Sequence, residues 1–194
     1  MQSLIFATNN PNKVAEIKKV VGTHFNIITL REAGIDIDIP EPHDTLAANA
    51  VEKSSTIHRL TQQNCFSEDT GLEVEALNGQ PGVLSARYAG VNATSTENIH
   101  KLLRELGNNT HRKARFRTVI SLILNQQTYF FEGICNGTIT TELSGEDGFG
   151  YDPIFIPDGS TKTFAQMTME EKNKYSHRKK ATAQLIQFLT ETTF

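Results

Sequence analysis

The sequence predicts an α/β domain built around a mixed sheet, and three observations support that prediction. Strand and helix patterns alternate through the first part of the 194-residue chain. A long hairpin pattern follows them, and amphipathic helices close the chain. Alternating strands and helices favour parallel strand pairs, whereas a hairpin adds an antiparallel pair. No repeat or linker interrupts this order, so we expect one domain over residues 1–194.

The first predicted helix lies between two apolar segments, residues 3–8 and 25–30, which are typical of buried strands. Asn10 is a good helix cap, and Pro11 suits the first helical position. Apolar residues recur at helical spacing after Pro11, and Gly22 ends the pattern. The N-terminal part therefore reads as strand, helix, strand.

A second helix is predicted from Thr45 to about Gln63. Residues 35–40, which precede it, alternate isoleucine with polar residues or proline, and this is typical of a half-buried extended segment. We expect the inward-facing side of the helix to carry Leu46, Ala50, Ile57 and Leu60.

Two short strands follow at residues 65–68 and 72–77, interrupted at Thr70-Gly71. Asn78-Gly79 predicts a turn and Pro81-Gly82 a further break. A third helix is capped by Thr94 or Ser95 and ended by Gly107, and a hairpin of residues 114–125 and 128–138 follows it. A strand is predicted at 153–156, and the capping box Thr168 to Glu171 opens a helical turn. The last predicted helix is capped by Ser176 and buries Ala181, Leu185, Phe188 and Leu189.

Composition excludes several classes of protein. Hydrophobic residues make up 38% of the chain and charged residues 21%, which excludes a disordered chain and a coiled coil. A net charge of −3 weighs against a general nucleic-acid-binding protein. The longest apolar run is too short to cross a bilayer. Cys65 and Cys135 lack metal-type spacing and predict unpaired thiols in a reducing compartment.

Charge is distributed unevenly along the chain. Residues 32–44 include five carboxylates and no Lys or Arg, whereas residues 172–180 include five basic residues and no carboxylate. Both runs are compatible with solvated faces. They are also compatible with a site that holds cations on one side and a polyanion on the other, as a metal–phosphate substrate requires.

Four short segments contain side chains that could bind a ligand or act in catalysis. The first is the polar loop after the first strand, which consists of Thr8, Asn9, Asn10, Pro11, Asn12 and Lys13. Helix N-termini favour anions, so this loop could hold a phosphate, with Lys13 adding positive charge. It lacks the Gly-x4-Gly-Lys pattern of a Walker loop. The alternative is an ordinary Asn-capped junction.

The second segment is Glu68-Asp69-Thr70-Gly71, at a strand end where open α/β sheets place ligands. Neighbouring strand residues face opposite ways, so a single carboxylate would reach a given metal directly unless the chain bends at Thr70-Gly71. Carboxylates with water and phosphate oxygens are the usual environment of magnesium. The alternative is a solvated acidic turn.

The third and fourth segments contain aromatic and basic side chains. Phe149, Gly150, Tyr151 and Asp152 could stack on a planar base and accept its hydrogen bonds; the alternative is a connection whose aromatics pack inward. Ser176-His177-Arg178 places basic side chains in a first helical turn, where the helix dipole disfavours them, and this suggests an anionic or acceptor-rich partner. The alternative is a solvated basic helix start.

The order of these segments resembles the noncanonical purine nucleoside triphosphate pyrophosphatases, the inosine triphosphatase or Ham1-like family. The resemblance runs from Thr8 to Ala181. It rests on Thr8-Asn9-x3-Lys13, Glu41 before Thr45-x3-Asn49-Ala50-x2-Lys53, Glu68-Asp69-Thr70-Gly71-Leu72, Leu77-x-Gly79-x-Pro81-Gly82-Val83-x-Ser85-Ala86-Arg87-Tyr88, Gly148-Phe149-Gly150-Tyr151-Asp152-Pro153 and Glu171-Lys172-Asn173-x2-Ser176-His177-Arg178. Leu84, Ala48 and Gln166 depart from residues common in the family, at positions that the predicted catalysis does not use.

The resemblance implies hydrolysis of ITP, dITP and XTP to the monophosphate and pyrophosphate, with Mg2+, by a cytoplasmic homodimer that clears deaminated purines. It implies a mixed, curved sheet with flanking helices in two lobes around a central cleft. The family pattern favours Asp69 as the general base and Glu41 as a metal ligand, with Glu68 and Asp69 as further candidate ligands. Thr8 to Lys13, Lys53, Thr70, Phe149 to Asp152, Lys172, His177 and Arg178 are implied to bind substrate.

Chemistry suggests how the purine base is selected. Hypoxanthine and xanthine have a 6-oxo acceptor, whereas adenine has a 6-amino donor. Arg178 carries donors alone, and so does a protonated His177. Donors aimed at position 6 would accept oxo purines and reject adenine. Two alternatives remain: a pyrophosphatase for another class of modified nucleotide, and a non-catalytic nucleotide-binding module.

Overall fold

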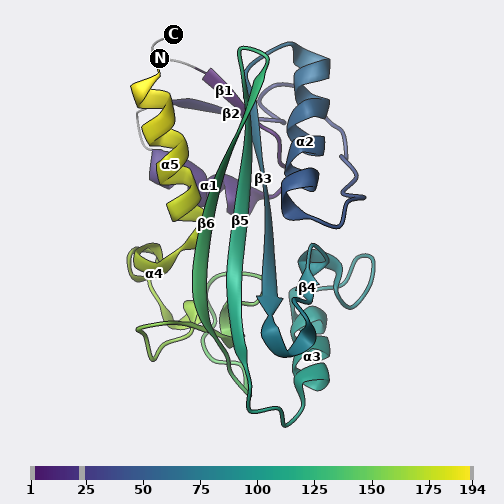
Figure 1. The fold of residues 1–194 in the computed structure, drawn as a ribbon, viewed down its shortest axis with the longest axis vertical. Helices are drawn as coiled ribbons and strands as arrows, with labels where there is room; N and C mark the ends of the chain where they lie inside the picture. Colours follow the sequence, from purple (N-terminus) through teal and green to yellow (C-terminus); the bar gives the residue numbers. More distant parts are fainter. Residues whose placement is uncertain (1–2, 22–24, 193–194) are drawn as a thin grey trace. The chain divides into compact units, whose positions relative to one another are not determined.

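The computed structural model describes residues 3–21 and 25–192, and it confirms an α/β fold with a mixed sheet. The strands run in the order β2-β1-β3-β5-β6-β7, with β4 paired to β3 (Figure 1). β1 (Ser3–Phe6) pairs in parallel with β2 (Asn26–Thr29) and β3 (Cys65–Val74). β4 (Pro81–Gly82) is antiparallel to β3, and β7 (Phe155–Pro157) is antiparallel to β6 (Gln127–Ile139).

The described residues form two compact units, and the prediction of one domain over 1–194 stays a prediction. Unit 1 comprises described residues of 1–69, 118–133 and 178–194, and unit 2 comprises residues 70–117 and 134–177. The boundaries fall inside β3, β5 (Lys113–Leu124) and β6, so each of these strands contributes to both units. Each unit has its own buried hydrophobic core.

The helices follow the local signals closely. α1 (Pro11–Val21) begins at Pro11, and Asn10 Oδ1 accepts from the backbone N–H groups of Asn12 and Lys13 at 3.0 and 3.2 Å. The predicted end of this helix at Gly22 lies outside the described residues. α2 (Leu46–Thr61) is capped by Thr45, and α3 (Ser95–Leu106) begins with a complete capping box on Thr94.

The C-terminal helices also begin where the sequence predicts. α4 (Met169–Tyr175) opens with the Thr168–Glu171 capping box, and α5 (His177–Glu191) follows directly after Ser176 (Figure 1). Short 3-10 helices complete the fold; they are η1 (Glu75–Leu77), η2 (Ser85–Arg87), η3 (Asp152–Ile154) and η4 (Phe164–Gln166).

Some local predictions are wrong. Residues 75–77, expected in a strand, form η1, and residues 153–154, expected in a strand, belong to η3. Residues 65–74 form one strand of 10 residues, where the sequence predicted an interruption at Thr70-Gly71. Gly71 does not break the strand, because its missing side chain leaves room for the neighbouring strand: a Cβ there would lie 2.5 Å from the carbonyl oxygen of Gly82. Leu60 is 61% exposed where we expected it inward, since it lies in the last turn of α2, past the buried face that ends at Ile57.

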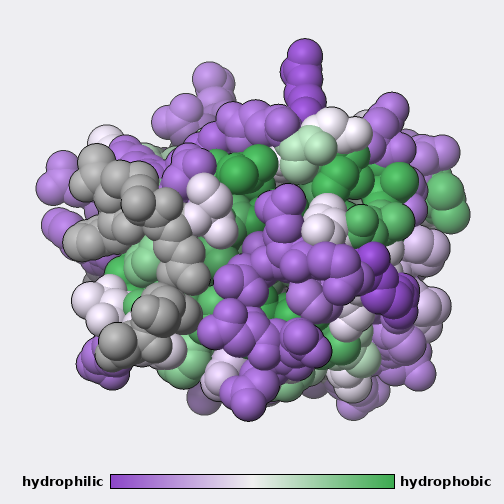
Figure 2. Space-filling view, turned by 90° about the horizontal axis from the view of Figure 1, so that it is seen from above, coloured by the Kyte–Doolittle hydropathy of each residue, from purple (hydrophilic) through white to green (hydrophobic). Residues whose placement is uncertain are grey.

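Exposed apolar residues such as Leu60 are part of an otherwise mixed surface. Figure 2 shows one face on which hydrophobic residues are visible between hydrophilic ones. Among the described residues no helix is long and apolar enough to cross a membrane. Cys65 and Cys135 are both buried and form no disulfide, as the spacing predicted.

Candidate active site

The loop after β1 adopts the predicted cap geometry. The Asn10 backbone N–H donates to Thr8 Oγ1 at 3.2 Å, and Asn9 Nδ2 donates to the Ile37 carbonyl at 2.8 Å. α1 is long enough for its first turn to present backbone N–H groups to an anion. The loop therefore has the backbone geometry of a phosphate-binding site, with Lys13 in the first turn of the helix.

Glu68 is held in unit 1 by two cations. Arg178 Nε lies 2.9 Å from each of its carboxylate oxygens, and Lys13 Nζ lies 3.3 Å from Oε1. Burial alone would raise the pKa of Glu68, but Arg178 and Lys13 together outweigh burial, and its pKa lies below the ordinary value. Glu68 is therefore a buried carboxylate that stays ionised.

Glu16 completes this ion-pair chain, and the sequence analysis missed it. Arg178 Nη1 donates to Glu16 Oε2, so the guanidinium is bonded to two carboxylates. Glu16 lies three residues after Lys13 on α1, a spacing that places both side chains on the same helix face. A carboxylate beside Ile17, on the face that the helix buries, was the signal that could have revealed it.

A second set of charges in unit 1 meets at the Lys53 ammonium. Lys53 Nζ donates to Glu41 Oε1, and it lies 3.4 Å from Asp69 Oδ1. Asp69 is 5% exposed, and this burial raises its pKa more than Lys53 and Lys13 lower it. The two neighbouring carboxylates on β3 therefore differ: the pKa of Glu68 is lowered and that of Asp69 is raised. A raised pKa makes a carboxylate a better proton acceptor.

The Lys13 ammonium, the second cation that contacts Glu68, loses its proton more readily than an ordinary lysine. Burial lowers the pKa of the Lys13 ammonium more than Glu68 raises it, so that pKa lies below the ordinary value. An incoming polyanion would stabilise the charged form of Lys13.

In unit 2 the backbone of the glycine-rich segment, residues 148–150, lies close to the Asp152 carboxylate. Asp152 Oδ2 accepts from the Phe149 backbone N–H at 2.9 Å and from Lys172 Nζ at 2.7 Å. Gly148 has φ +81°, and a Cβ at this position would collide with Asp152 Oδ2. The glycine is therefore required both by the backbone conformation and by the close approach of the carboxylate.

The Lys172 ammonium lies between two aromatic rings of unit 2. Its Nζ is 5.0 Å from the ring centre of Phe149 and 5.4 Å from that of Phe164. Cation–π contacts at this distance hold a cation over a ring face. Together with the Asp152 ion pair, they keep a buried lysine in one position next to the half-buried Phe149 ring.

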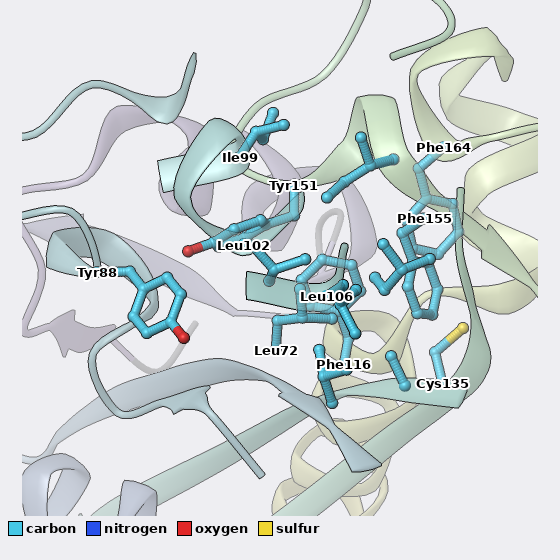
Figure 3. Packing of buried hydrophobic residues seen from close by; sticks show 14 of the residues in the cluster. Leu72, Tyr88, Ile99, Leu102, Leu106, Phe116, Cys135, Tyr151, Phe155 and Phe164 are labelled. Carbon is cyan, nitrogen blue, oxygen red and sulfur yellow. The ribbon is translucent and has the colours of Figure 1, made fainter. Parts of the chain in front are cut away.

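Tyr151 is part of the hydrophobic core. It is 4% exposed, and Figure 3 shows its ring beside Leu102 among the buried side chains of unit 2. Its hydroxyl donates to the Ser85 carbonyl at 2.9 Å, and burial raises its pKa above the ordinary value. The side chain thus anchors the segment that carries Phe149 and Asp152.

His177 is also buried in unit 2. Its imidazole stacks on the ring of Phe116, a residue that the sequence analysis placed in a predicted strand without a functional role. The ring centres of His177 and Phe116 are 4.8 Å apart and the planes differ by 10°.

The structure thus divides the predicted residues into two sets. Unit 1 holds Thr8, Asn9, Asn10, Pro11, Asn12, Lys13, Glu41, Lys53, Glu68, Asp69 and Arg178, and unit 2 holds Thr70, Phe149, Gly150, Tyr151, Asp152, Lys172 and His177. The chain passes from one unit to the other between Asp69 and Thr70 and again between His177 and Arg178. Among these residues, Lys13, Lys53, Lys172 and Arg178 each form an ion pair with a carboxylate of the same unit.

The carboxylates can be tested as a site for a divalent cation. In the described part of the chain, no group of three or more His, Cys, Asp or Glu side chains is arranged to hold a metal. Glu41 and Asp69 do converge on one point of positive charge, the Lys53 ammonium. Magnesium is commonly held by one or two carboxylates together with substrate phosphates and water. The pair Glu41 and Asp69 fits that requirement, whereas both oxygens of Glu68 are already bonded to Arg178.

Comparison with known proteins gives one consistent result. The model of the Ham1 family matches residues 4–188. The dITP/XTP pyrophosphatase of Flavobacterium johnsoniae is 48% identical over 97% of this chain and 98% of its own, and that of Porphyromonas gingivalis is 52% identical over the same shares. Among solved structures, the Staphylococcus aureus Ham1 protein is 40% identical with a TM-score of 0.89, covering 97% of this chain and 98% of that one. A HAM1 protein from Coxiella burnetii is 36% identical with a TM-score of 0.91, covering 99% and 100%.

Proposed function

This chain belongs to the Ham1 family, and from that membership we propose that it hydrolyses noncanonical purine nucleoside triphosphates to the monophosphate and pyrophosphate. dITP and XTP are the substrates named for its relatives, and ITP shares the base of dITP. One structural observation carries the proposal: Asp69 is a buried carboxylate with a raised pKa, beside the Lys53 ammonium.

Asp69 acts as the general base. A water attacks the α-phosphorus, its proton passes to an Asp69 carboxylate oxygen, and the bond from the α-phosphorus to the bridging oxygen of pyrophosphate breaks. Pyrophosphate keeps that bond's electron pair. Phosphoryl transfer depends mainly on positioning and on stabilising charge. Lys13 and Lys53 supply positive charge in unit 1, where the cap of α1 provides backbone donors for phosphate oxygens.

Mg2+ is the proposed cofactor, and Glu41 and Asp69 would hold it. When bound, it would neutralise the developing charge on pyrophosphate. Glu68, which the sequence also offered as a ligand, has a different role in this proposal, because its ion pairs hold Lys13 and Arg178.

The base is recognised by the unit 2 set, with Phe149 as the stacking ring and His177 as the donor toward position 6. Arg178 has a different role from the one expected, because its Nε and Nη1 donors are bonded to Glu68 and Glu16. We assign Arg178 to the carboxylate cluster. Tyr151 anchors its segment through Ser85 instead of meeting the base. A cytoplasmic homodimer remains the expected form of the protein.

The deciding experiment measures pyrophosphate release from ITP, dITP, XTP, GTP and ATP with Mg2+ and with EDTA. We expect release from the oxo purines ITP, dITP and XTP, little from ATP, and none with EDTA. Equal rates for all five nucleotides, or a preference for pyrimidine nucleotides in a wider panel, would contradict the proposed substrate class. Binding of ITP without any release would indicate a nucleotide-binding module.

A further inference from the structure

Phe116 lies on β5 in unit 2, and it packs flat against His177, the first residue of α5. The nearly parallel rings, with centres 4.8 Å apart, are 7% and 4% exposed. The two residues are 61 positions apart in the sequence, so nothing in the local sequence predicts the contact. The imidazole therefore has one face covered by a fixed aromatic surface.

Two further rings hold Phe116 itself. Phe155 meets it edge-on, with ring centres 4.7 Å apart and planes at 64°, and Phe164 lies 6.0 Å away at 24°. Figure 3 shows Phe116, Phe155 and Phe164 in the buried cluster of unit 2. Because packed cores resist small displacements, Phe116 presents its free face to His177 in a defined orientation.

We propose that Phe116 is a positioning residue that controls purine selectivity by fixing the plane of the His177 imidazole. This inference rests on the proposed function. The N–H donors of imidazole lie in the ring plane, and a hydrogen bond weakens steeply as its angle departs from linear. The terminal torsion of a histidine is broad, so the side chain alone does not fix that plane. A flat ring stacked at 10° does fix it. In the proposed function, that plane contains the donor that meets the 6-oxo group.

The same arrangement explains why the contact is aromatic. A leucine or methionine would fill much of the volume of Phe116 but would present no flat face. Packing alone would accept any of these residues, whereas orientation of the imidazole requires a ring. Replacement by tyrosine keeps the ring and replacement by leucine or methionine removes it, so the two explanations make different predictions.

The test compares Phe116→Leu, Phe116→Met and Phe116→Tyr with the wild type, and Ile99→Ala is the matched control. Ile99 belongs to the same buried cluster but lies on α3, outside the set of stacked rings. For each variant we would measure the melting temperature, kcat and KM for ITP and ATP, and the inhibition constant of inorganic tripolyphosphate, which has no base.

We expect Phe116→Leu and Phe116→Met to lower the ratio of kcat/KM for ITP to that for ATP by about three- to ten-fold, the range for one weakened neutral hydrogen bond. The loss should appear mainly in KM for ITP, and tripolyphosphate inhibition should not change. Phe116→Tyr should keep the ratio near that of the wild type. Ile99→Ala should keep it too, even where its melting temperature falls as far. If Phe116→Leu fails to fold, Phe116→Met decides.

A double-mutant cycle with His177→Ala separates positioning from general packing. If Phe116 acts through His177, Phe116→Leu should not lower the ITP-to-ATP ratio further in the His177→Ala background. An equal additional loss there, or an unchanged ratio in the single variants, would overturn the inference. Absence of pyrophosphate release by the wild type would instead overturn the proposed function, so the two failures are distinguishable.

Discussion

The candidate residues of the two units differ in their chemistry. Unit 1 gathers seven charged side chains, three cations and four carboxylates, in two neighbouring sets of ion pairs: Lys13, Glu16, Glu68 and Arg178, and Lys53, Glu41 and Asp69. Unit 2 contributes one buried ion pair, Lys172 with Asp152, surrounded by aromatic rings. Buried charges suit a polyanion and proton transfer, whereas flat rings suit a planar base.

The comparison leads to an expected division between reaction and selectivity. Changes in the charged set of unit 1 should affect every nucleotide, since the triphosphate is common to all. Changes in the aromatic set of unit 2 should affect nucleotides according to their base. The four predictions below test this division, in order of decreasing expected effect.

The largest effect is expected for Asp69→Asn. The amide keeps the shape of the side chain but cannot accept a proton, and loss of a general base costs about 10²–10⁴-fold in rate. Equilibrium binding of ITP should be largely kept, and the fold loss should be similar for every nucleotide hydrolysed. Asp158→Asn, at an exposed position of unit 2, is the control. Pyrophosphate release within a few-fold of the wild type would remove Asp69 from the mechanism.

Arg178→Ala is expected to reduce stability and activity together. It leaves the buried carboxylates Glu68 and Glu16 without their shared cation, and breaking a buried pair by removing one partner costs about 3–5 kcal/mol. The ratio of kcat/KM for ITP to that for ATP should stay constant. Arg59→Ala, at a side chain 69% exposed, should change stability by less than about 0.5 kcal/mol. A collapse of the ITP-to-ATP ratio would instead assign Arg178 to the base and break the division between the units.

The Arg178 contacts also show what the sequence could not predict. Helix starts were predicted well because capping is local: the boxes at Thr94 and Thr168 each span four residues. The Arg178–Glu16 pair joins residues 162 positions apart, and no periodicity reports such a pair. The sequence suggested an anionic or acceptor-rich partner for the basic residues at the start of α5, and Arg178 is bonded to Glu68 and Glu16, carboxylates of the chain itself.

Other misses have the same origin. The continuity of β3 through Gly71 depends on the approach of Gly82, and the exposure of Leu60 depends on where the surface beneath α2 ends. The identities of Asp69, Lys53, Lys172 and His177 as candidates were available from motif order. Their environments were not, since the pKa shift of Asp69 and the stack on His177 arise from side chains brought together by folding.

Lys53→Ala is expected to raise KM and lower kcat, each by roughly ten-fold. The ammonium is held between Glu41 and Asp69, where it can contact phosphate in both the ground state and the transition state, so both constants should move. ITP and ATP should lose efficiency equally. The control is Lys18→Ala, whose partner Glu32 is an exposed carboxylate on the same unit. Unchanged constants in a variant of normal melting temperature would make Lys53 a structural residue.

The smallest effect is expected for Tyr151→Phe, and it sharpens the comparison inside unit 2. The phenylalanine keeps the buried ring and loses the hydrogen bond to the Ser85 carbonyl, which should lower the free energy of unfolding by about 1 kcal/mol. Ser85 Oγ also accepts from the Leu72 backbone N–H at 2.9 Å, so the lost bond is one of several that hold this loop, and the fold should survive. The relative kcat/KM values for ITP, XTP and ATP should not change, because the hydroxyl is bonded to the Ser85 carbonyl. Tyr129→Phe, which loses a more exposed hydroxyl contact to Gln127, should cost less stability.

Denaturant unfolding together with a three-substrate kinetic panel checks both statements. A shift in the ITP-to-ATP ratio for Tyr151→Phe at unchanged stability would return the hydroxyl to the base-binding set, and would leave Phe149 and His177 as part of a larger hydrogen-bonding surface for the purine.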